Sequence, residues 1–404
     1  MLDRAHFEDL DAQDPFRATV AQFRLPEGTV YLDGNSLGPL PAHVADVLGD
    51  VVERQWGEDL ITSWNRNGWW TMARAVGDKL APVIGAPPAS VIAGDGTSVA
   101  LYKAVGAALA LRPDRSVVLT DTGNFPTDLY VLRSVAGRYG AEVLEVEPGE
   151  VAGAIDAATA VVALTHVDYR TSRRHPMGEL TERAHAAGSV VVWDLCHSAG
   201  VLDLDLTDVD LAVGCGYKYL NGGPGSPAFI YVHPQHQDVV ENPINGWWGH
   251  DEPFAMQGDF TPAAGIDRMQ VGTQPILSLA AFHAALDVFA GVDMARLEEK
   301  AHRLTSDFIR LVDARLDGFE VIAPRQPEQR GSHVSLRHPD APAIMAALIS
   351  SGVIGDVRPP HLLRFGFSPI FQRHVDVWDA VEVMSAVMAG DAWRRAPVPI
   401  GPVT

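Results

Sequence analysis

The sequence predicts an α/β protein with two unequal domains: a large domain with a mostly parallel sheet covered by helices on both faces, and a smaller α+β C-terminal domain. Three observations support this prediction. The chain has 404 residues, 47% of them hydrophobic and 20% charged, which exceeds one ordinary domain and allows a sizeable core. Between about Ser90 and Val232, short apolar runs alternate with helical stretches. After about Gly291, one long amphipathic pattern leads into short mixed elements.

The first part of the chain, residues 1–57, is predicted to be an N-terminal arm and a helix that pack with the small domain. The segment YLDGNSLGPLP is rich in turn residues, and Pro41 is well placed at the start of the helix that follows.

The large domain is predicted over residues 58–290, and it begins with a helical stretch through WWTMARAVGDKLAPVIG. Its strands are predicted at VIAG, SVVLT, AEVLEV, AVVALTHV, SVVVWD, DLAVGCG and AFIYVH. Parallel sheets of this kind bind ligands at the carboxyl ends of their strands. We therefore expect the functional residues at those ends.

The small domain is predicted over residues 291–404. Apolar residues recur every three or four positions from Met294 to Leu316, which indicates one long amphipathic helix. Strand-like runs (FEVIAP, HVSLRH, VIGDVR, LLRFGFS) and two helical runs (APAIMAALISSG, VDVWDAVEVMSAV) follow.

Composition restricts the partners and the compartment. The formal net charge is −20, which disfavours nucleic-acid and anionic-membrane partners. No apolar stretch approaches the roughly 20 residues of a membrane-spanning helix, and the charged N-terminus does not resemble a signal peptide. With only two cysteines, Cys196 and Cys215, no disulfide framework is expected. We therefore expect a cytoplasmic protein, and the scattered histidines predict no metal site.

Lys218 is the first candidate for chemistry. The chain contains four lysines, and the other three lie in helical patterns, where we expect their charged heads to reach water. Lys218 instead follows the apolar run DLAVGCG and precedes NGGPGSP. Burial disfavours an ammonium group, and Schiff-base chemistry requires the neutral amine. The alternative is a strand-end lysine that points into solvent.

Asp194 ends the apolar run SVVVWD, 24 residues before Lys218. A carboxylate at the end of a buried strand needs a cationic partner, which in a pyridoxal-phosphate site is the protonated ring nitrogen. His197 could reach the phenolate oxygen of the same cofactor. The alternatives are a helix N-cap for Asp194 and a packing or capping role for His197.

Three other segments carry candidate ligand-binding residues. Thr97 and Ser98 open a helix after a glycine-rich turn, where phosphate can bind, although both are also ordinary caps. Phe125 could lie against a planar ring and Asp128 could add a second carboxylate, although such a Phe is usually part of a core. Arg364, flanked by apolar residues, needs an anion such as a substrate carboxylate or the partner in a structural salt bridge.

At this point the residues resemble a known family. The segments GDGTS, NFPTD, THVDYRTSRRHPM, VVWDLCHSAG, GCGYKYLNGGPGSPAFIYV, NGWWGH and GTQPI are similar to those of kynureninases, class V-like members of the aspartate-aminotransferase fold class. The resemblance covers nearly the whole chain, from YLDGNSLGP to RFGFSP. YKYLNGGPG and NGWWGH are its most specific parts, whereas the WD and GTS pieces occur across the wider fold class.

The resemblance implies an activity. Kynureninases use pyridoxal 5′-phosphate to hydrolyse L-kynurenine to anthranilate and L-alanine through an aldimine and a ketimine, in the kynurenine pathway of tryptophan catabolism. Some members act on 3-hydroxykynurenine. The resemblance also implies a homodimer with shared active sites.

The resemblance assigns roles to individual residues. Lys218 corresponds to the residue that binds the cofactor covalently, Tyr217 to an acid/base group, and Asp194 and His197 to the ring-nitrogen and phenolate contacts. The cofactor-binding set is Thr97, Ser98, Phe125, Asp128, Asp168, Asp194, His197, Tyr217, Lys218, Trp247 and Thr273, of which Trp247 and Thr273 can come from the neighbouring subunit. The substrate-binding set is Arg364, Trp64, Ser36 and Gly272. Trp64, Gly272 and Thr273 resemble the bacterial-type residues that accompany unmodified kynurenine.

Three alternatives remain at this stage. A pyridoxal-phosphate-dependent aminotransferase shares the fold and these residues. Cysteine desulfurases and selenocysteine lyases also share the fold, but they carry a late sulfur-abstracting cysteine, and this chain has none after Cys215. A non-catalytic binding protein of the same fold is disfavoured because Lys218, Asp194 and Arg364 are all present.

Overall fold

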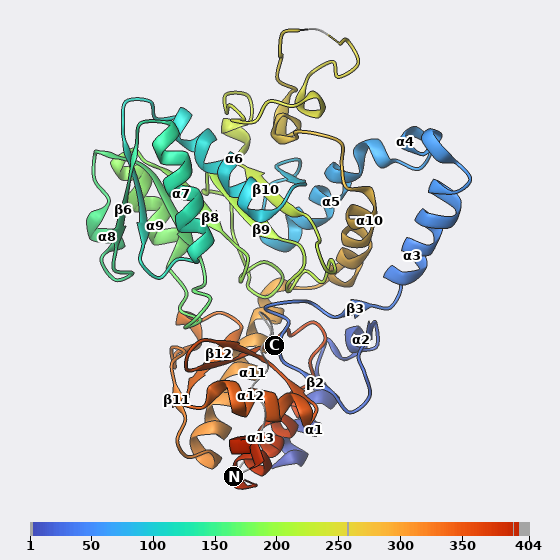
Figure 1. The fold of residues 1–404 in the computed structure, drawn as a ribbon, viewed down its shortest axis with the longest axis vertical. Helices are drawn as coiled ribbons and strands as arrows, with labels where there is room; N and C mark the ends of the chain where they lie inside the picture. Colours follow the sequence, from blue (N-terminus) through green and yellow to red (C-terminus); the bar gives the residue numbers. More distant parts are fainter. Residues whose placement is uncertain (1–2, 257, 391, 396–404) are drawn as a thin grey trace.

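The structure is a computed structural model that describes residues 3–256, 258–390 and 392–395. The chain forms two lobes, the larger one built on a seven-stranded sheet and the smaller one on a four-stranded sheet (Figure 1). The strand orders are β4-β10-β9-β8-β7-β5-β6 and β11-β12-β15-β14. The predicted fold class is thereby confirmed.

The large sheet consists of short apolar strands whose central members are buried on both faces. The strands are β4 (Val91–Ala93), β5 (Val117–Asp121), β6 (Glu142–Val146), β7 (Thr159–Thr165), β8 (Val190–Asp194), β9 (Leu211–Cys215) and β10 (Ala228–Val232). All neighbours pair in parallel except β10, which is antiparallel to β4 and β9. In the register of β7 and β8, Thr165 lies opposite Asp194 at the carboxyl ends of the strands.

Helices flank this sheet. They are α5 (Met72–Leu80), α6 (Thr97–Ala110), α7 (Pro126–Arg138), α9 (Met177–Ala187) and α10 (Ile276–Ala285). Helix α6 packs against β7, β8, β9 and β10, which explains why it is apolar around most of its circumference.

The small lobe has its own hydrophobic core. It contains α11 (Met294–Arg315), β11 (Glu320–Val321), β12 (His333–Arg337), α12 (Ala341–Ser350), β13 (Val353–Ile354), β14 (Asp356–Arg358), β15 (Leu362–Gly366) and α13 (His374–Ala389). Its four-stranded sheet is antiparallel. Among the described residues, no single helix is both long and apolar enough to cross a membrane; only a pair bent by 86°, Ile276–Phe289 with Met294–Arg315, passes that test when joined.

The N-terminal arm contacts both lobes. Helix α1 (Arg4–Gln13) packs on α13, and β2 (Val30–Tyr31) pairs with β13, whereas α3 (Val44–Asp50) packs on α10 of the large lobe. The predicted packing of residues 1–57 on the small domain therefore describes the first part of that segment, and the domain limits stay a prediction.

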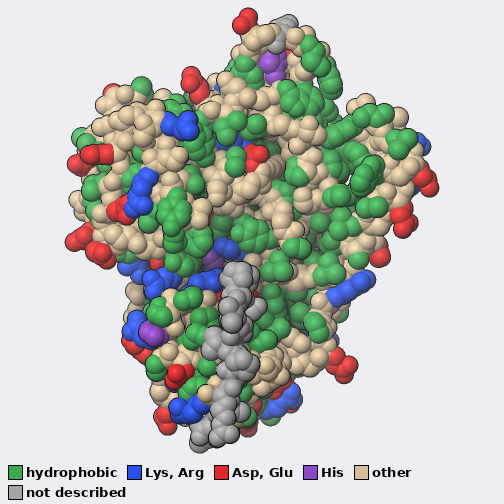
Figure 2. Space-filling view, viewed as in Figure 1, with side chains coloured by type: hydrophobic (Ala, Val, Ile, Leu, Met, Phe, Trp, Pro, Cys, Tyr) green, Lys and Arg blue, Asp and Glu red, His purple; other side chains and the backbone are tan. Residues whose placement is uncertain are grey.

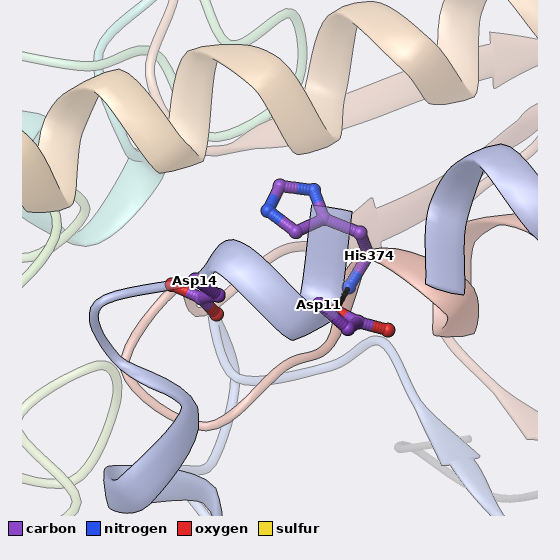
Figure 3. A group of neighbouring side chains, drawn as sticks. All are labelled: Asp11, Asp14 and His374. Atoms are coloured by element: carbon purple, nitrogen blue, oxygen red, sulfur yellow. Dashed lines mark hydrogen bonds between the residues drawn. The ribbon is translucent and has the colours of Figure 1, made fainter. Parts of the chain in front are cut away.

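A polar cluster fastens the arm to the small lobe. The Asp11 carboxylate accepts hydrogen bonds from the backbone N–H groups of His374 (2.6 Å) and Val375 (3.1 Å) at the start of α13 (Figure 3). Asp14 pairs with the Lys300 ammonium at 2.6 Å. Asp11, Asp14 and His374 are residue types that bind metals, but in this cluster the carboxylates cap a helix and neutralise a lysine.

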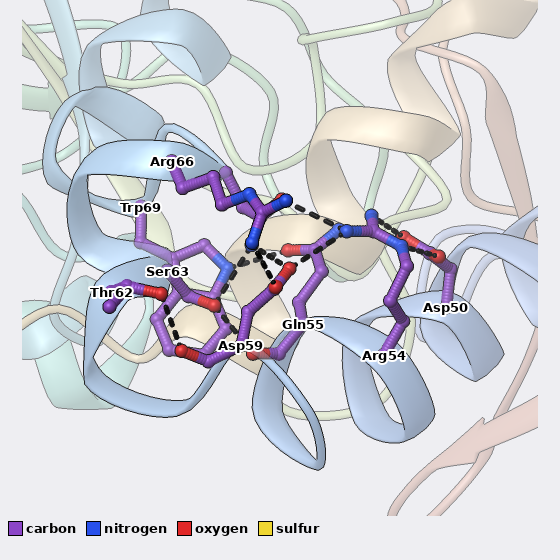
Figure 4. Close-up of polar contacts among 9 residues, drawn as sticks. Asp50, Arg54, Gln55, Asp59, Thr62, Ser63, Arg66 and Trp69 are labelled. Carbon is purple, nitrogen blue, oxygen red and sulfur yellow. Dashed lines mark hydrogen bonds and ion pairs between the residues drawn. The ribbon is translucent and has the colours of Figure 1, made fainter.

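Between α3 and α5 the chain forms short helices, which are η1 (Val51–Trp56), η2 (Leu60–Thr62), α4 (Ser63–Arg66) and η3 (Trp69–Thr71). A polar network links them (Figure 4): Asp59 accepts from Arg54 (3.0 Å) and Arg66 (2.8 Å), and the Trp69 indole N–H donates to Gln55 Oε1 (2.7 Å). This network fixes the segment that carries Trp64.

Candidate active site

A cavity of about 380 Å³ lies at the carboxyl ends of the large-sheet strands, between the two lobes. Residues from the sheet, the N-terminal arm and the small lobe line it. Ten residues predicted from the sequence meet there: Ser36, Thr97, Ser98, Phe125, Asp128, Asp194, His197, Tyr217, Lys218 and Arg364.

Lys218 follows β9, and its Nζ lies 3.0 Å from His197 Nε2. The other three lysines pair with carboxylates at 2.6 Å: Lys79 with Asp287, Lys103 with Asp95 and Lys300 with Asp14. Among the described residues, Lys218 is thus the one lysine without a carboxylate partner. Burial, with the Lys218 charge as the next cause, keeps the pKa of His197 well below its usual value. A neutral imidazole therefore faces the amine at neutral pH.

The loop that carries Lys218 is held by close contact with the arm. The Gly38 N–H donates to the Tyr217 carbonyl at 2.8 Å. A Cβ atom at Gly38 would lie 2.4 Å from the Lys218 carbonyl oxygen, so the approach requires glycine.

Two carboxylates lie together at the base of the cavity. The Thr165 hydroxyl is 3.4 Å from Asp194 Oδ2 and 3.5 Å from Asp128 Oδ2. Burial, together with the neighbouring Asp194 charge, raises the pKa of Asp128 well above its usual value. No salt bridge neutralises either carboxylate in the described part of the chain, although both are buried. Because buried carboxylates require compensation, this pair fits a ligand that presents a cationic N–H group.

The N-terminus of α6 borders the cavity from another side. No side chain caps this helix, and Thr97 and Ser98 in its first turn line the cavity. Free amides, hydroxyls and the positive end of a helix favour a phosphate group there. The residues present therefore fit both ends of pyridoxal phosphate.

Sequence reasoning was wrong about Lys103, whose head was expected to reach water. Lys103 is only 2% exposed, and Nζ donates to Asp95 Oδ2 and to the Met269 carbonyl, both at 2.6 Å. Asp95 precedes Thr97 in the glycine-rich turn, so Lys103 fixes the turn from behind. The same expectation is wrong for Lys300, which is also buried.

Arg364, on β15, is 1% exposed. Its Nε donates to Asp356 Oδ1 at 2.8 Å, its Nη1 to the Tyr169 carbonyl at 2.8 Å, and its Nη2 to Ser36 Oγ at 3.0 Å. Arg364 therefore forms a structural salt bridge with Asp356 and also lines the cavity. Asp356 and Arg358 on β14, and Tyr169, were not singled out from the sequence.

Aromatic and phenolic groups form another wall. The Phe125 and Tyr169 rings meet edge to face, with centroids 5.0 Å apart. Tyr217 lies beside Lys218, whose Nζ is 5.9 Å from the centre of the tyrosine ring. Burial raises the pKa of Tyr217 above its usual value.

Five predicted site residues lie outside this cavity. Asp168 lines a neighbouring one, and its Oδ1 accepts the backbone N–H groups of Arg170 (2.9 Å) and Thr171 (2.6 Å), so it stabilises its own turn. Trp64 packs on Trp69 and Trp248. The remaining three also lie elsewhere: Trp247 is 41% exposed, Gly272 and Thr273 line one further cavity together, and Thr273 also lines another.

The neighbouring cavity that Asp168 lines is basic on one side. Arg170, Arg173 and Arg337 contribute to its wall. Figure 2 shows Lys and Arg side chains gathered at the junction of the two lobes, in contrast to the acidic net charge of the chain.

Comparison with known proteins identifies the family. The chain is 46% identical over 396 residues to a kynureninase from Burkholderia pseudomallei (strain K96243), covering 95% of each protein. The chain belongs to the kynureninase family. It is also 46% identical over 398 residues to a kynureninase from Pseudomonas fluorescens, covering 96% of each. The family model of the kynureninase C-terminal domain matches residues 297–384, which include the buried Arg364 and its partner Asp356.

Solved structures with the same fold are more distant in sequence. A cysteine desulfurase from Thermococcus onnurineus NA1 superposes with a TM-score of 0.78 at 18% identity, covering 93% of this chain and 98% of the other. A cysteine desulfurase from Escherichia coli gives 0.76 at 19% identity, with coverages of 96% and 99%. A variant of C-DES with glycine covalently linked to its pyridoxal phosphate gives 0.75 at 17% identity, with coverages of 95% and 99%. These similarities establish the fold alone.

Proposed function

We propose that this member of the kynureninase family hydrolyses L-kynurenine to anthranilate and L-alanine, with pyridoxal 5′-phosphate bound covalently to Lys218. The observation that carries the proposal is Lys218 itself. Among the residues that the structure describes, no carboxylate pairs with its amine, and it shares a cavity with the buried carboxyl groups of Asp128 and Asp194. The sequence identity to named kynureninases over almost the whole chain supports the same reaction.

The cavity residues would hold the cofactor as follows. Thr97, Ser98 and the N-terminus of α6 would bind the phosphate, and Asp194 would bind the ring nitrogen. His197 would contact the phenolate oxygen, and Phe125 the ring. When bound, the cofactor supplies an electron sink for the charge that develops on the substrate when its α-proton is removed.

The side chains of this protein would then position the substrate and move its protons. Arg364, with Ser36 beside it, binds and orients the substrate carboxylate. Lys218, freed when the substrate amine takes its place, would take the α-proton. Tyr217 lies beside Lys218 and would relay protons; burial raises its pKa, so the hydroxyl holds its proton at neutral pH. Water would then add to the ketone, and the bond between Cβ and the carbonyl carbon would break. Cβ would take a proton, and the two fragments would leave as anthranilate and alanine.

The proposal includes a homodimer with shared active sites. Large apolar side chains are exposed on the segment before α4 and on the loop after Trp247, among them Ile61 (77% exposed) and Phe254 (68%). Figure 2 shows hydrophobic side chains spread over the arm that contains α3 and α4. Such surfaces mark protein interfaces. In the dimer, Trp247 and Thr273 of each subunit would lie at the active-site cavity of the other subunit.

Mixing two inactive variants tests the shared site. Lys218→Ala and Trp247→Ala disable different residues, so heterodimers of the two regain one intact site if Trp247 acts across the interface. We expect activity to return on mixing after dissociation and reassociation. Activity that stays at the level of the separate variants contradicts the shared site.

Two finer points belong to the same proposal. The bacterial-type residues Trp64, Gly272 and Thr273 support a preference for kynurenine over 3-hydroxykynurenine. Cys196 and Cys215 are free and buried, which supports a reducing compartment such as the cytoplasm.

The reaction is tested by adding L-kynurenine to the purified, cofactor-loaded protein and measuring anthranilate fluorescence, with 3-hydroxykynurenine in parallel. We expect anthranilate and L-alanine in equal amounts. Lys218→Ala should abolish turnover, whereas Lys79→Ala, which removes a surface ion pair, should not. Product that appears only when a keto acid is supplied would instead identify an aminotransferase.

A further inference from the structure

Arg364 has little unused capacity for hydrogen bonding. Its Nε and Nη2 bind the Asp356 carboxylate, its Nη1 binds the Tyr169 carbonyl, and its Nη2 also binds Ser36. A guanidinium group has five N–H donors, so a single N–H on Nη1 remains for a substrate. A carboxylate that is gripped by two parallel hydrogen bonds needs another donor.

Arg358 is placed to supply that donor. It lies on β14, next to β15, and lines the same cavity as Arg364 and Lys218. Its Nη2 contacts Asp356 Oδ2 at 2.8 Å, and its Nη1 donates to the Val357 carbonyl at 3.2 Å. The side chain is 31% exposed and lines the cavity, whereas its Nε is buried.

Each terminal nitrogen of Arg358 has one acceptor within the protein, Asp356 Oδ2 for Nη2 and the Val357 carbonyl for Nη1. A terminal guanidinium nitrogen carries two N–H groups. One N–H on each of these nitrogens is therefore left for an oxygen of a ligand in the cavity.

The charge of this corner also favours an anionic ligand. Arg358 and Arg364 share one carboxylate, that of Asp356. Burial opposes its ionisation, but Arg364 and Arg358 hold the pKa of Asp356 below its usual value. The pKa of the nearby Asp33 is raised to about 7 by burial and by Asp356, so Asp33 contributes only part of a negative charge at neutral pH. The two arginines are therefore not neutralised by their surroundings.

We infer that Arg358 and Arg364 together bind the α-carboxylate of the amino-acid substrate, with the remaining terminal N–H groups of Arg358 as the donors that Arg364 lacks. This inference rests on the proposed function and adds a residue to it. Arg358 then selects for substrates with a free carboxylate, whereas Asp356 holds the two guanidinium groups in place.

A structural role for Arg358 makes a different prediction. If Arg358 only positions Asp356, its loss should impair every substrate by the same factor. If it binds the carboxylate, its loss should impair L-kynurenine far more than L-kynurenine carboxamide, which carries no negative charge at that position.

The test compares kcat/KM for L-kynurenine and its carboxamide in the wild-type protein, Arg358→Gln and Arg358→Lys. Arg325→Gln serves as the matched control, because Arg325 forms an exposed ion pair with Asp313 in the same lobe. For Arg358→Gln we expect kcat/KM for the acid to fall about 10- to 100-fold, the usual effect of losing a charge-assisted hydrogen bond, and the value for the amide to change less than about twofold. Arg358→Lys keeps the charge but loses the planar set of guanidinium N–H groups, so the acid-to-amide ratio should fall by an intermediate factor. Arg325→Gln should leave the ratio unchanged.

An unchanged acid-to-amide ratio in Arg358→Gln overturns the inference; if that variant does not fold, the ratio in Arg358→Lys decides. Failure of the proposed function is a separate outcome, in which the wild-type protein forms no anthranilate. In that case calorimetric titration with L-alanine and L-alaninamide tests directly whether Arg358 and Arg364 bind the carboxylate. Equal binding of both by wild-type protein, or an equal loss of both in Arg358→Gln, rejects it.

Discussion

The ion pair between the buried Lys103 and the partly exposed Asp95 predicts an unusual order of stabilities among three variants. Lys103 is 2% exposed and donates only to Asp95 and to the Met269 carbonyl. Asp95→Asn removes the compensating charge and leaves an ammonium group in the core, which typically costs about 3–5 kcal/mol. Because the Asp95 side chain is 30% exposed and water can reach it, we expect a loss of about 2–3 kcal/mol. Lys103→Met removes the buried charge itself and keeps most of the packing, so we expect a loss of about 1 kcal/mol.

The double variant gives the sharpest comparison. Asp95→Asn with Lys103→Met contains no stranded ammonium, so it should be more stable than Asp95→Asn alone. Burial lowers the pKa of Lys103, and Asp95 opposes that shift. Without Asp95 the folded-state pKa should fall further below that of the unfolded chain. The unfolded state then binds more protons, so the deficit of Asp95→Asn should shrink as pH rises from 7 to 9.

Urea unfolding of the apoprotein, followed by circular dichroism, measures these differences. Absorbance titration with pyridoxal phosphate then reports the effect on the turn that carries Thr97 and Ser98; the affinity should fall most in Asp95→Asn. If Lys103→Met costs as much as Asp95→Asn, or if the double variant loses the sum of the two, the reasoning about a stranded charge is wrong.

Two more predictions concern the surroundings of the site. Gly38→Ala places a Cβ 2.4 Å from the Lys218 carbonyl, so it should lower the free energy of unfolding in urea by about 1–3 kcal/mol and lower kcat. The control, Gly49→Ala in helix α3, meets nothing within 4 Å and should be neutral or stabilising by up to about 1 kcal/mol. Equal effects of the two substitutions would contradict the steric account. For Asp33, the raised pKa of about 7 means that burial costs nothing below the unfolded value of 3.8 and that stability is lost as pH rises from 3.8 to about 7. Asp33→Asn should therefore gain roughly 2–3 kcal/mol relative to wild type between pH 5 and pH 8, and a gain that does not depend on pH would reject the assignment.

Much of the fold could be predicted from the sequence because continuous apolar runs specify strands that are buried on both faces. The carboxyl ends of parallel strands meet at one edge of the sheet, so the sequence alone predicts that Asp194 and Lys218 lie near each other. The reversed direction of β10 was not predicted, because an apolar run of five residues carries no information about its direction.

The burial of Lys103 could have been noticed. Its helix, TSVALYKAVGAALAL, is apolar on nearly every face, so a lysine there has no polar face to occupy. Arg358 and Asp356 gave no such signal, because they lie on a three-residue strand whose position depends on pairing with β15.

The residues that remain outside the cavity have a different explanation. Trp64, Trp247, Gly272 and Thr273 were assigned through the family resemblance, and no periodicity within one chain places them together. In the proposed dimer, Trp247 and Thr273 would come from the second subunit, which a single sequence does not describe.

The most direct test of the account is to identify the residue that carries the cofactor. The holoenzyme is reduced with borohydride, digested, and mapped by mass spectrometry. The account predicts a reduced pyridoxyl phosphate adduct on the peptide that contains Lys218 and none on Lys79, Lys103 or Lys300. An adduct on another lysine, or a protein that takes up no cofactor, contradicts it.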